Sequence, residues 1–127
     1  MGFTLLIADD EPALRTVLTL ALRSDGHSVE AVADGQEALE RLRSDVTFDA
    51  VIVDNNMPVK GGIEVLREMR AEARFGGVAA ILLTAEDDER TRTRALEAGA
   101  DAVLQKPMRN AELRARVREI VELKQRG

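Results

Sequence analysis

Residues 50–62 read AVIVDNNMPVKGG, and the fold prediction depends on the pattern in this stretch. Its first four residues are apolar without interruption, which is typical of a strand buried on both faces of a parallel sheet. Asp54 ends the apolar run, and the proline and glycines that follow mark a loop. The stretch therefore predicts a buried strand with a polar side chain at its carboxyl end, followed by a loop and then a helix.

The same unit recurs on both sides of this stretch. Apolar runs at residues 3–8, 79–83 and 102–104, and a further expected strand at residues 29–33, are each followed by a segment with apolar residues at helical spacing. In the first such segment the expected buried face consists of Leu14, Val17, Leu18, Ala21 and Leu22. In the last segment the residues expected to point inward are Leu113, Val117, Ile120 and Val121. The chain thus alternates between strand and helix along its whole length.

Candidate capping residues mark where several helices begin. Asp34 and Glu37 have the spacing of a capping box, in which two side chains satisfy free backbone N–H groups of the first turn. Asp87 or Asp88 is expected to cap the fourth helix, and Asn110 is expected to cap the fifth.

Strand–helix pairs with continuously apolar strands predict an α/β fold, in which helices cover both faces of a parallel sheet. Right-handed crossovers restrict the topology to a doubly wound arrangement, either flavodoxin-like or Rossmann-like. We expect a flavodoxin-like (βα)5 domain with a five-stranded sheet in the order 2-1-3-4-5. The length of 127 residues suits one such domain, and a closed eightfold barrel would need about twice as many. We expect residues 1–127 to form this domain, without an effector domain.

Composition excludes several classes of function. The formal net charge of -5 argues against nonspecific binding to nucleic acid, which requires a basic surface. The absence of cysteine excludes disulfides, thiolate metal sites and cysteine nucleophiles. The longest apolar run, residues 78–83, is too short to cross a bilayer, and the N-terminus lacks the pattern of a secretion signal. We therefore expect a cytoplasmic location and no direct nucleic-acid or membrane partner.

Polar side chains stand at the carboxyl ends of four expected strands. Asp9 and Asp10 follow the first strand, Asp54 the third, Thr84 the fourth and Lys106 the fifth. In a doubly wound sheet, ligands bind beyond these ends, where the winding direction reverses. The carboxylates would converge there on one crevice, where their mutual repulsion requires a counter-charge. Mg²⁺ suits such a site, because it is bound through carboxylates, waters and phosphate oxygens.

These residue types together can carry out phosphoryl transfer. A carboxylate beside a bound Mg²⁺ can attack phosphorus and form an acyl phosphate. The cation and a lysine would share the charge on the equatorial oxygens of the transferring group, and a threonine hydroxyl could donate to the same oxygens.

Over essentially its whole length, the chain resembles the receiver domain of two-component response regulators, and this resemblance is carried by several short motifs. They are Asp9-Asp10, Asp54 with Met57-Pro58, Thr84-Ala85, Ala98-Gly99-Ala100-Asp101 and Lys106-Pro107, in this order and at the spacing of the family. Each motif is weak by itself, whereas the ordered set is highly specific. The resemblance implies a signalling domain that phosphorylates and dephosphorylates only its own aspartate, rather than an enzyme that acts on a separate substrate.

The resemblance also implies roles for the acids. Asp54 would be the phosphoacceptor. Asp10 and Asp54 would bind Mg²⁺ directly, Asp9 would bind it through water, and the backbone carbonyl of Asn56 would complete the site.

The remaining roles follow from the same resemblance. Lys106 would pair with Asp54 at rest and with the phosphoryl group afterwards, while Thr84 would move toward that group and carry the signal. Ala85, and Pro107 after a cis peptide bond, would modulate the site. The phosphodonor would be a sensor histidine kinase, a histidine phosphotransfer protein or a small acyl phosphate. The domain would act on an unknown output protein, with the last two helices as the candidate surface, as a monomer or a weak phosphorylation-dependent dimer.

Some positions differ from the usual receiver pattern. Val103 stands where an aromatic switch residue is common, so the output movement must differ from the usual coupled one. Lys60 stands where an apolar residue is common, and Gly61 where an acid or its amide is frequent. Asn56 and Glu86, two positions after the phosphoacceptor and the threonine, resemble the pair in chemotaxis-type receivers and predict a short-lived phosphoaspartate.

Three other functions fit parts of the pattern. A Mg²⁺-dependent phosphohydrolase or phosphotransferase of the haloacid-dehalogenase type would need a second acid two residues after the nucleophile, where this chain has Asn56. A pseudo-receiver that signals by contact alone would not need the complete set of acids and lysine. A nucleotide-binding domain would need a glycine-rich phosphate cradle in the first strand–helix loop, and that loop has none.

Two further features have simpler interpretations. His27 follows a helix-ending glycine and is expected to be structural or exposed. Arginines of the last two helices could form one basic surface, although such a run is usually a solvated face. These arginines are Arg90, Arg92, Arg94, Arg114, Arg116 and Arg118.

Overall fold

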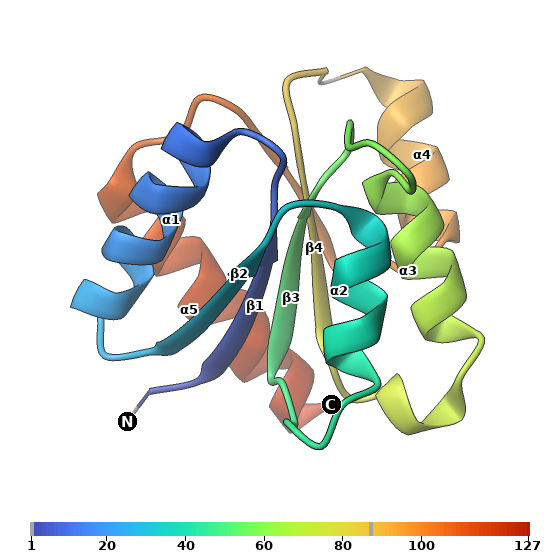
Figure 1. Ribbon diagram of the computed structural model, residues 1–127, viewed down its shortest axis with the longest axis horizontal. Helices are drawn as coiled ribbons and strands as arrows, with labels where there is room; N and C mark the ends of the chain where they lie inside the picture. The colour runs from blue at the N-terminus through green and yellow to red at the C-terminus, as the bar shows by residue number, and fades with distance from the viewer. Residues whose placement is uncertain (1, 87) are drawn as a thin grey trace.

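The computed structural model describes residues 2–86 and 88–127, which contain a five-stranded parallel sheet (Figure 1). The strand order is β2-β1-β3-β4-β5, which confirms the expected flavodoxin-like topology. The strands are β1 (Thr4–Ala8), β2 (Ser28–Val32), β3 (Ala50–Asp54), β4 (Ala79–Thr84) and β5 (Ala102–Gln105). The helices are α1 (Pro12–Ser24), α2 (Gly35–Leu42), α3 (Gly62–Arg70), α4 (Glu89–Glu97) and α5 (Asn110–Arg126), with a short 3-10 helix, η1 (Ala73–Phe75), before β4.

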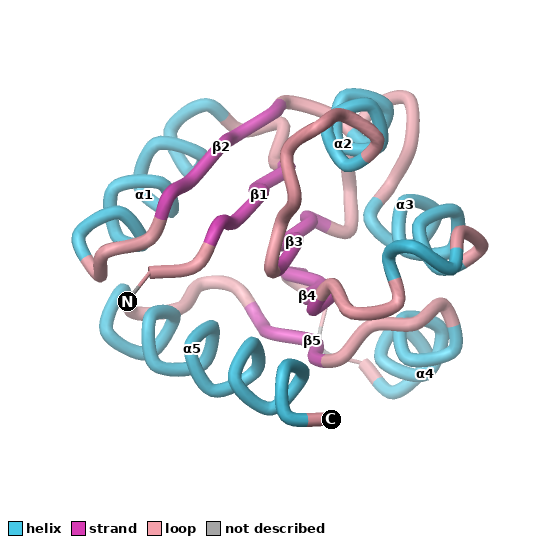
Figure 2. Tube along the Cα trace, turned by 90° about the horizontal axis from the view of Figure 1, so that it is seen from below, coloured by secondary structure: helices cyan, strands magenta, loops and turns pink. Residues whose placement is uncertain are grey.

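Helices cover both faces of the sheet, with α1 and α5 on one face and α2, α3 and α4 on the other (Figure 2). Alternate residues of each strand contribute to the two hydrophobic cores, as the period of two along a strand requires. In β3, Ala50 and Ile52 pack with α1 and α5, whereas Val51 and Val53 pack with the other three helices. This double burial explains why the central strand β3 is apolar up to Asp54, whereas the edge strand β2 contains Ser28 and Glu30.

The register of the strands brings the polar residues to the same edge of the sheet. Ala8 of β1 is opposite Val53 of β3, so the next residues, Asp9 and Asp54, continue side by side. On the other side of β3, Asp54 is opposite Leu83, the residue before Thr84. The carboxyl edge of the central strands therefore gathers the candidate site.

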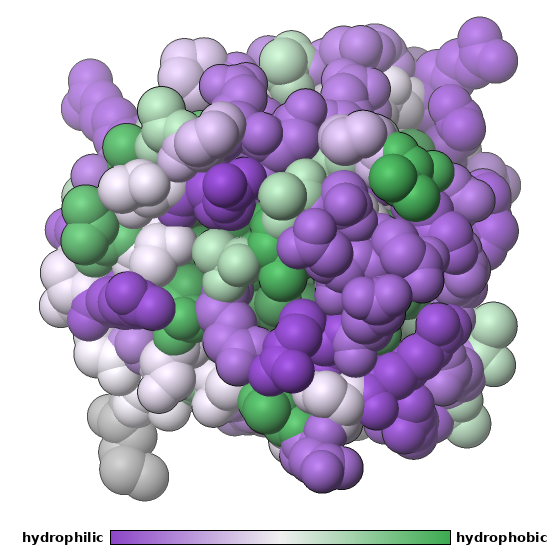
Figure 3. Space-filling view, viewed as in Figure 1, coloured by the Kyte–Doolittle hydropathy of each residue, from purple (hydrophilic) through white to green (hydrophobic). Residues whose placement is uncertain are grey.

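Two observations concern the surface. Within residues 2–86 and 88–127, no helix combines the length and apolarity required to span a bilayer. On the face shown in Figure 3, hydrophilic side chains predominate, and the hydrophobic ones form separate small groups.

The buried face of α1 is narrower than expected. Leu18, Ala21 and Leu22 are buried, and Leu14 is half-buried against them. Val17, which was expected to be buried, is instead 45% exposed. The prediction for Val17 is wrong because this residue lies at the edge of the stripe, where it lines a surface groove with Met108 rather than contacting the sheet.

The expected caps of α2 and α4 are confirmed in part. The Asp34 carboxylate accepts a hydrogen bond from the Glu37 N–H at 2.9 Å, while the Glu37 carboxylate accepts from the Ala33 N–H at 3.4 Å. Asp88 caps α4 and accepts from the Thr91 N–H at 2.7 Å. Asp87, the other candidate cap, lies outside the described residues.

The expected cap of α5 is wrong by one residue. Asn110 is the first residue of the helix, and Arg109 occupies the N-cap position without a side-chain hydrogen bond to the helix. The reason is that Arg109 has an extended backbone and its carbonyl already accepts from the Leu113 N–H, at 2.9 Å. The exposed Asn110 side chain therefore has no capping function.

We expect the two candidate cap positions to respond differently to truncation, because only Asp34 accepts a hydrogen bond from a free backbone N–H. Asp34→Ala should lower the free energy of unfolding by about 0.5–2 kcal/mol, whereas Asn110→Ala should change it by less than about 0.5 kcal/mol. Urea unfolding measures both values. Equal losses in the two variants would contradict the assignment of Arg109 as the N-cap.

Candidate functional site

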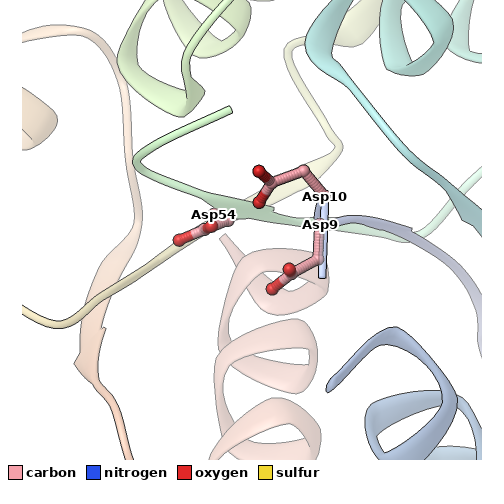
Figure 4. A group of neighbouring side chains, drawn as sticks. All are labelled: Asp9, Asp10 and Asp54. Atoms are coloured by element: carbon pink, nitrogen blue, oxygen red, sulfur yellow. The ribbon is translucent and has the colours of Figure 1, made fainter. Parts of the chain in front are cut away.

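Three acids meet at the carboxyl edge of the sheet. Asp9 and Asp10 follow β1, and Asp54 is the last residue of β3, so neighbouring strands present them to the same space (Figure 4). A carboxylate oxygen from each lies within 4.8 Å of the others. Asp9 and Asp54 are buried, while Asp10 is exposed to solvent. Three carboxylates at this separation could hold a metal ion.

Lys106 supplies the positive charge next to these acids. Its ammonium lies 2.9 Å from Oδ1 of Asp54 and 3.5 Å from Oδ2 of Asp9. The Lys106 backbone N–H donates to the carbonyl of Thr84 at 2.8 Å, which ties the loop after β5 to the end of β4. The pairing of Lys106 with Asp54, which the family resemblance implied, is therefore present.

Burial and the neighbouring charges shift the pKa values of both members of this pair. Burial raises the pKa of the Asp54 carboxyl above its ordinary value, and the charge of Asp9 acts in the same direction. Lys106 and the backbone N–H of Asn56 oppose this rise without cancelling it. Burial alone would lower the pKa of Lys106, but Asp54 and Asp9 outweigh burial and raise that pKa, so the ammonium stays protonated.

Asp9 is held in place by contacts that the sequence did not reveal. Its Oδ1 accepts from the Glu11 N–H at 2.9 Å, and its backbone carbonyl accepts from Nη1 of Arg15 at 2.8 Å. Its Oδ2 is buried and has no hydrogen-bond partner among the described residues. An arginine in the first turn of an amphipathic helix carries no local signal of this kind, because the contact depends on how α1 packs.

Thr84 is fully buried at the end of β4, and its hydroxyl accepts from the Glu86 N–H at 3.0 Å. Ala85, between them, is exposed. Pro107 follows a cis peptide bond, as expected. Val103 is buried in β5 and packs in the core on the side of α2, α3 and α4.

A polar groove opens beside the site between α3 and α4. Asn56 and Glu86 both line it, together with Arg67 and Arg94. The two positions that the sequence singled out for control of the phosphoaspartate thus share one surface. Arg67 and Arg94 were not identified from the sequence as part of the site.

The other two features of the sequence lie away from the acids. His27 is buried, its Nδ1 accepts from the Phe3 N–H at 2.9 Å, and its ring stacks on Phe3, so its role is structural. The arginines of the last helices do not form one surface. Arg94 lines the groove beside Asn56, whereas Arg118 pairs with Asp25 at the end of α1.

Comparison with known proteins agrees with this geometry. The family model described as the response regulator receiver domain matches residues 5–118. The DNA-binding response regulator MtrA of Mycolicibacterium smegmatis is 39% identical over 114 residues, which cover 90% of this chain and 48% of that protein. The response regulator MprA of Mycolicibacterium vanbaalenii is 40% identical over 121 residues, which cover 95% of this chain and 51% of that protein. The chain thus spans about half the length of these relatives.

A solved structure is similar over almost its whole length. The receiver domain of the sensor histidine kinase PA1611 from Pseudomonas aeruginosa superposes with a TM-score of 0.87 and is 34% identical. The match covers 96% of this chain and 99% of that domain, whose crystal structure has a magnesium ion coordinated in the active site cleft.

Removal of the Lys106 charge should destabilise the metal-free protein, because it leaves the acids without a counter-charge. For Lys106→Met we expect a loss of about 2 kcal/mol, between the limits for exposed and fully buried ion pairs. Addition of Mg²⁺ should restore part of this loss, since a ligand that binds only the folded state stabilises it. Denaturant unfolding with and without Mg²⁺ measures both effects.

Lys124→Met is the matched control, because Lys124 pairs with Asp101 at 3.1 Å on the exposed surface. This variant should lose less than about 1 kcal/mol and should gain no more from Mg²⁺ than the wild type. Similar behaviour of the two variants would show that Lys106 has no special function among the acids.

Proposed function

The chain belongs to the response regulator receiver family of two-component systems, and on this premise we propose that it accepts a phosphoryl group on Asp54 in a Mg²⁺-dependent reaction. The observation that carries the proposal is the position of Asp54, which lies beside two further acids and 2.9 Å from the Lys106 ammonium. This arrangement combines a nucleophile, a cation site and a lysine at one edge of the sheet.

The donor groups of the site fit Mg²⁺. Asp9, Asp10 and Asp54 would hold it with the backbone carbonyl of Asn56, and hard oxygen ligands of this kind are those that Mg²⁺ prefers. The buried Oδ2 of Asp9 has no hydrogen-bond partner and only the more distant ammonium of Lys106, at 3.5 Å, so a further cation beside it would be favourable. When bound, the ion would neutralise charge on the phosphoryl oxygens.

The chain's own residues would carry the reaction as follows. An oxygen of the Asp54 carboxylate attacks phosphorus, a new P–O bond forms, and the P–N bond of the donor phosphohistidine breaks, with its electron pair left on the imidazole nitrogen. Lys106, already at the reacting carboxylate, can then bind a phosphoryl oxygen. Thr84, at the end of β4, would donate a hydrogen bond from its hydroxyl to another of these oxygens. No separate substrate is needed.

The proposed partners follow from this chemistry. A sensor histidine kinase or a histidine phosphotransfer protein would supply the phosphoryl group in the cytoplasm, and an output protein or output domain would respond to the modified site. The alternative function of a phosphohydrolase that acts on small substrates is less well supported, because it requires a second acid at the position of Asn56. The reading as a pseudo-receiver is weaker because the site has its acids and lysine in contact.

We expect the protein to gain the mass of one phosphoryl group when it is incubated with acetyl phosphate and Mg²⁺. Asp54→Asn should abolish the gain, because an amide oxygen is a poor nucleophile, and a chelator should abolish it in the wild type. Intact-protein mass spectrometry measures the product. Asp45→Asn, at an exposed position after α2, is the control and should react like the wild type. Equal labelling of the Asp54 variant would sink the proposal.

We also expect the phosphoaspartate to be short-lived, because the Asn56 and Glu86 pair resembles that of chemotaxis-type receivers and both residues border the open groove beside the site. In excess Mg²⁺, after removal of the donor, the phosphorylated protein should lose its label within minutes. The measurement is the decay of the phosphorylated mass with time. A half-life of hours would contradict this expectation.

A further inference from the structure

The loop between β3 and α3 determines where Asn56 lies, and its ends are well anchored. The Asn55 N–H donates to the carbonyl of Leu83 at 3.0 Å, and the Asn55 carbonyl accepts from the Gly62 N–H at 3.2 Å. Met57 is partly buried and packs against the core. The tip of the loop projects beyond the sheet at the edge that carries the acids (Figure 1).

The tip has a strained backbone. Val59 has a φ of 68°, in the left-handed region that β-branched residues rarely adopt, and its side chain is 75% exposed. The Lys60 N–H donates to the carbonyl of Pro58 at 2.7 Å and closes a tight turn around Val59. An exposed side chain makes too few contacts to offset this strain, so the surroundings must hold the turn in place.

Within the tip, Lys60 makes the contacts that hold the turn in place. Its ammonium lies 2.6 Å from Oε2 of Glu68 in α3, and both side chains are partly buried, at 24% and 33% exposure. On its other side the Lys60 backbone lies against α2, where a Cβ added to Gly35 would come within 2.3 Å of the Lys60 carbonyl oxygen. Lys60 is therefore held between two helices.

We infer that the Lys60–Glu68 ion pair is a positioning device for the metal site, which holds the β3–α3 loop in the shape that presents Asn56 to Mg²⁺. The inference rests on the proposed function, in which the Asn56 carbonyl is a ligand. An apolar residue is common at this position in the usual receiver pattern, and burial would anchor such a residue. Here a charge pair between the loop and α3 does so instead.

The direction in which removal of the Lys60 charge changes the affinity for Mg²⁺ distinguishes a positioning role from a purely electrostatic one. A cation near the site repels Mg²⁺, so removal of the Lys60 charge would tighten Mg²⁺ binding if charge alone mattered. If Lys60 positions the loop, its removal weakens binding. Removal of the Glu68 charge weakens binding under both descriptions, so Lys60 is the decisive position.

The experiment is isothermal titration of the full chain with Mg²⁺ for Lys60→Gln, Glu68→Gln, the double variant and the swapped pair, in which Lys60→Glu is combined with Glu68→Lys. We expect each single variant to bind Mg²⁺ about threefold to tenfold more weakly, the range for a partly buried ion pair. The double variant should be no weaker than the single ones, and the swapped pair should recover most of the affinity. Addition of Val59→Asn to Lys60→Gln should also recover affinity, because asparagine tolerates a positive φ.

Glu72→Gln is the control, since it removes the same charge from a similar ion pair, at 2.7 Å to Arg43, away from the loop. It should leave the affinity for Mg²⁺ unchanged. Hydrogen exchange without metal gives an independent measurement, in which the amides of Lys60 and Gly62 should exchange faster in both single variants than in the control.

The outcomes separate the two proposals. If the wild-type protein does not bind Mg²⁺, the proposed function fails. If the wild type binds Mg²⁺ but Lys60→Gln binds it equally well or more tightly, only the positioning role of Lys60 is overturned. Unchanged exchange of the Lys60 and Gly62 amides would overturn it as well.

Discussion

The repulsion among Asp9, Asp10 and Asp54 is the constraint on which the site depends. A carboxylate oxygen from each lies within 4.8 Å of the others, and the Lys106 ammonium contacts Asp54 and Asp9. Burial strengthens the interactions of Asp9 and Asp54, because the surroundings of these two carboxylates screen charge less than water does. The pocket is therefore incomplete in an electrostatic sense, and a divalent cation would relieve the imbalance.

The acids come close together because of the arrangement of the strands in the sheet, and not because of their spacing in the sequence. Parallel strands in register carry Asp9 and Asp54 to the same level, and crossovers on both faces leave the carboxyl edge open to solvent. The two cores on either side of the sheet keep the strands fixed, so the acids cannot move apart to reduce their repulsion. Holding these like charges together therefore lowers the stability of the fold, as is common at functional sites.

Most of the fold and the principal site residues could be predicted from the sequence, because both depend on patterns within single elements. Continuous apolar runs located the strands, and the polar residue after each run located the site. The exposure of Val17 and the absence of a cap at Asn110 could not be predicted, because they depend on how a helix meets the sheet and where the chain enters it. The contacts of Arg15 with Asp9 and of Lys60 with Glu68 were missed for the same reason, since each joins a loop to a helix face through tertiary packing.

The Thr84 hydroxyl is bonded to the backbone of Glu86, two residues along the chain. If the side chain turned away from this amide, the main chain after β4 would lose this tie and would be free to change its course together with the hydroxyl. Val103, in the neighbouring strand β5, is too small to follow such a movement as a large ring could. A partner that distinguishes the two states of this molecule would then recognise the contour of the backbone between β4 and α4, and not the orientation of an aromatic side chain.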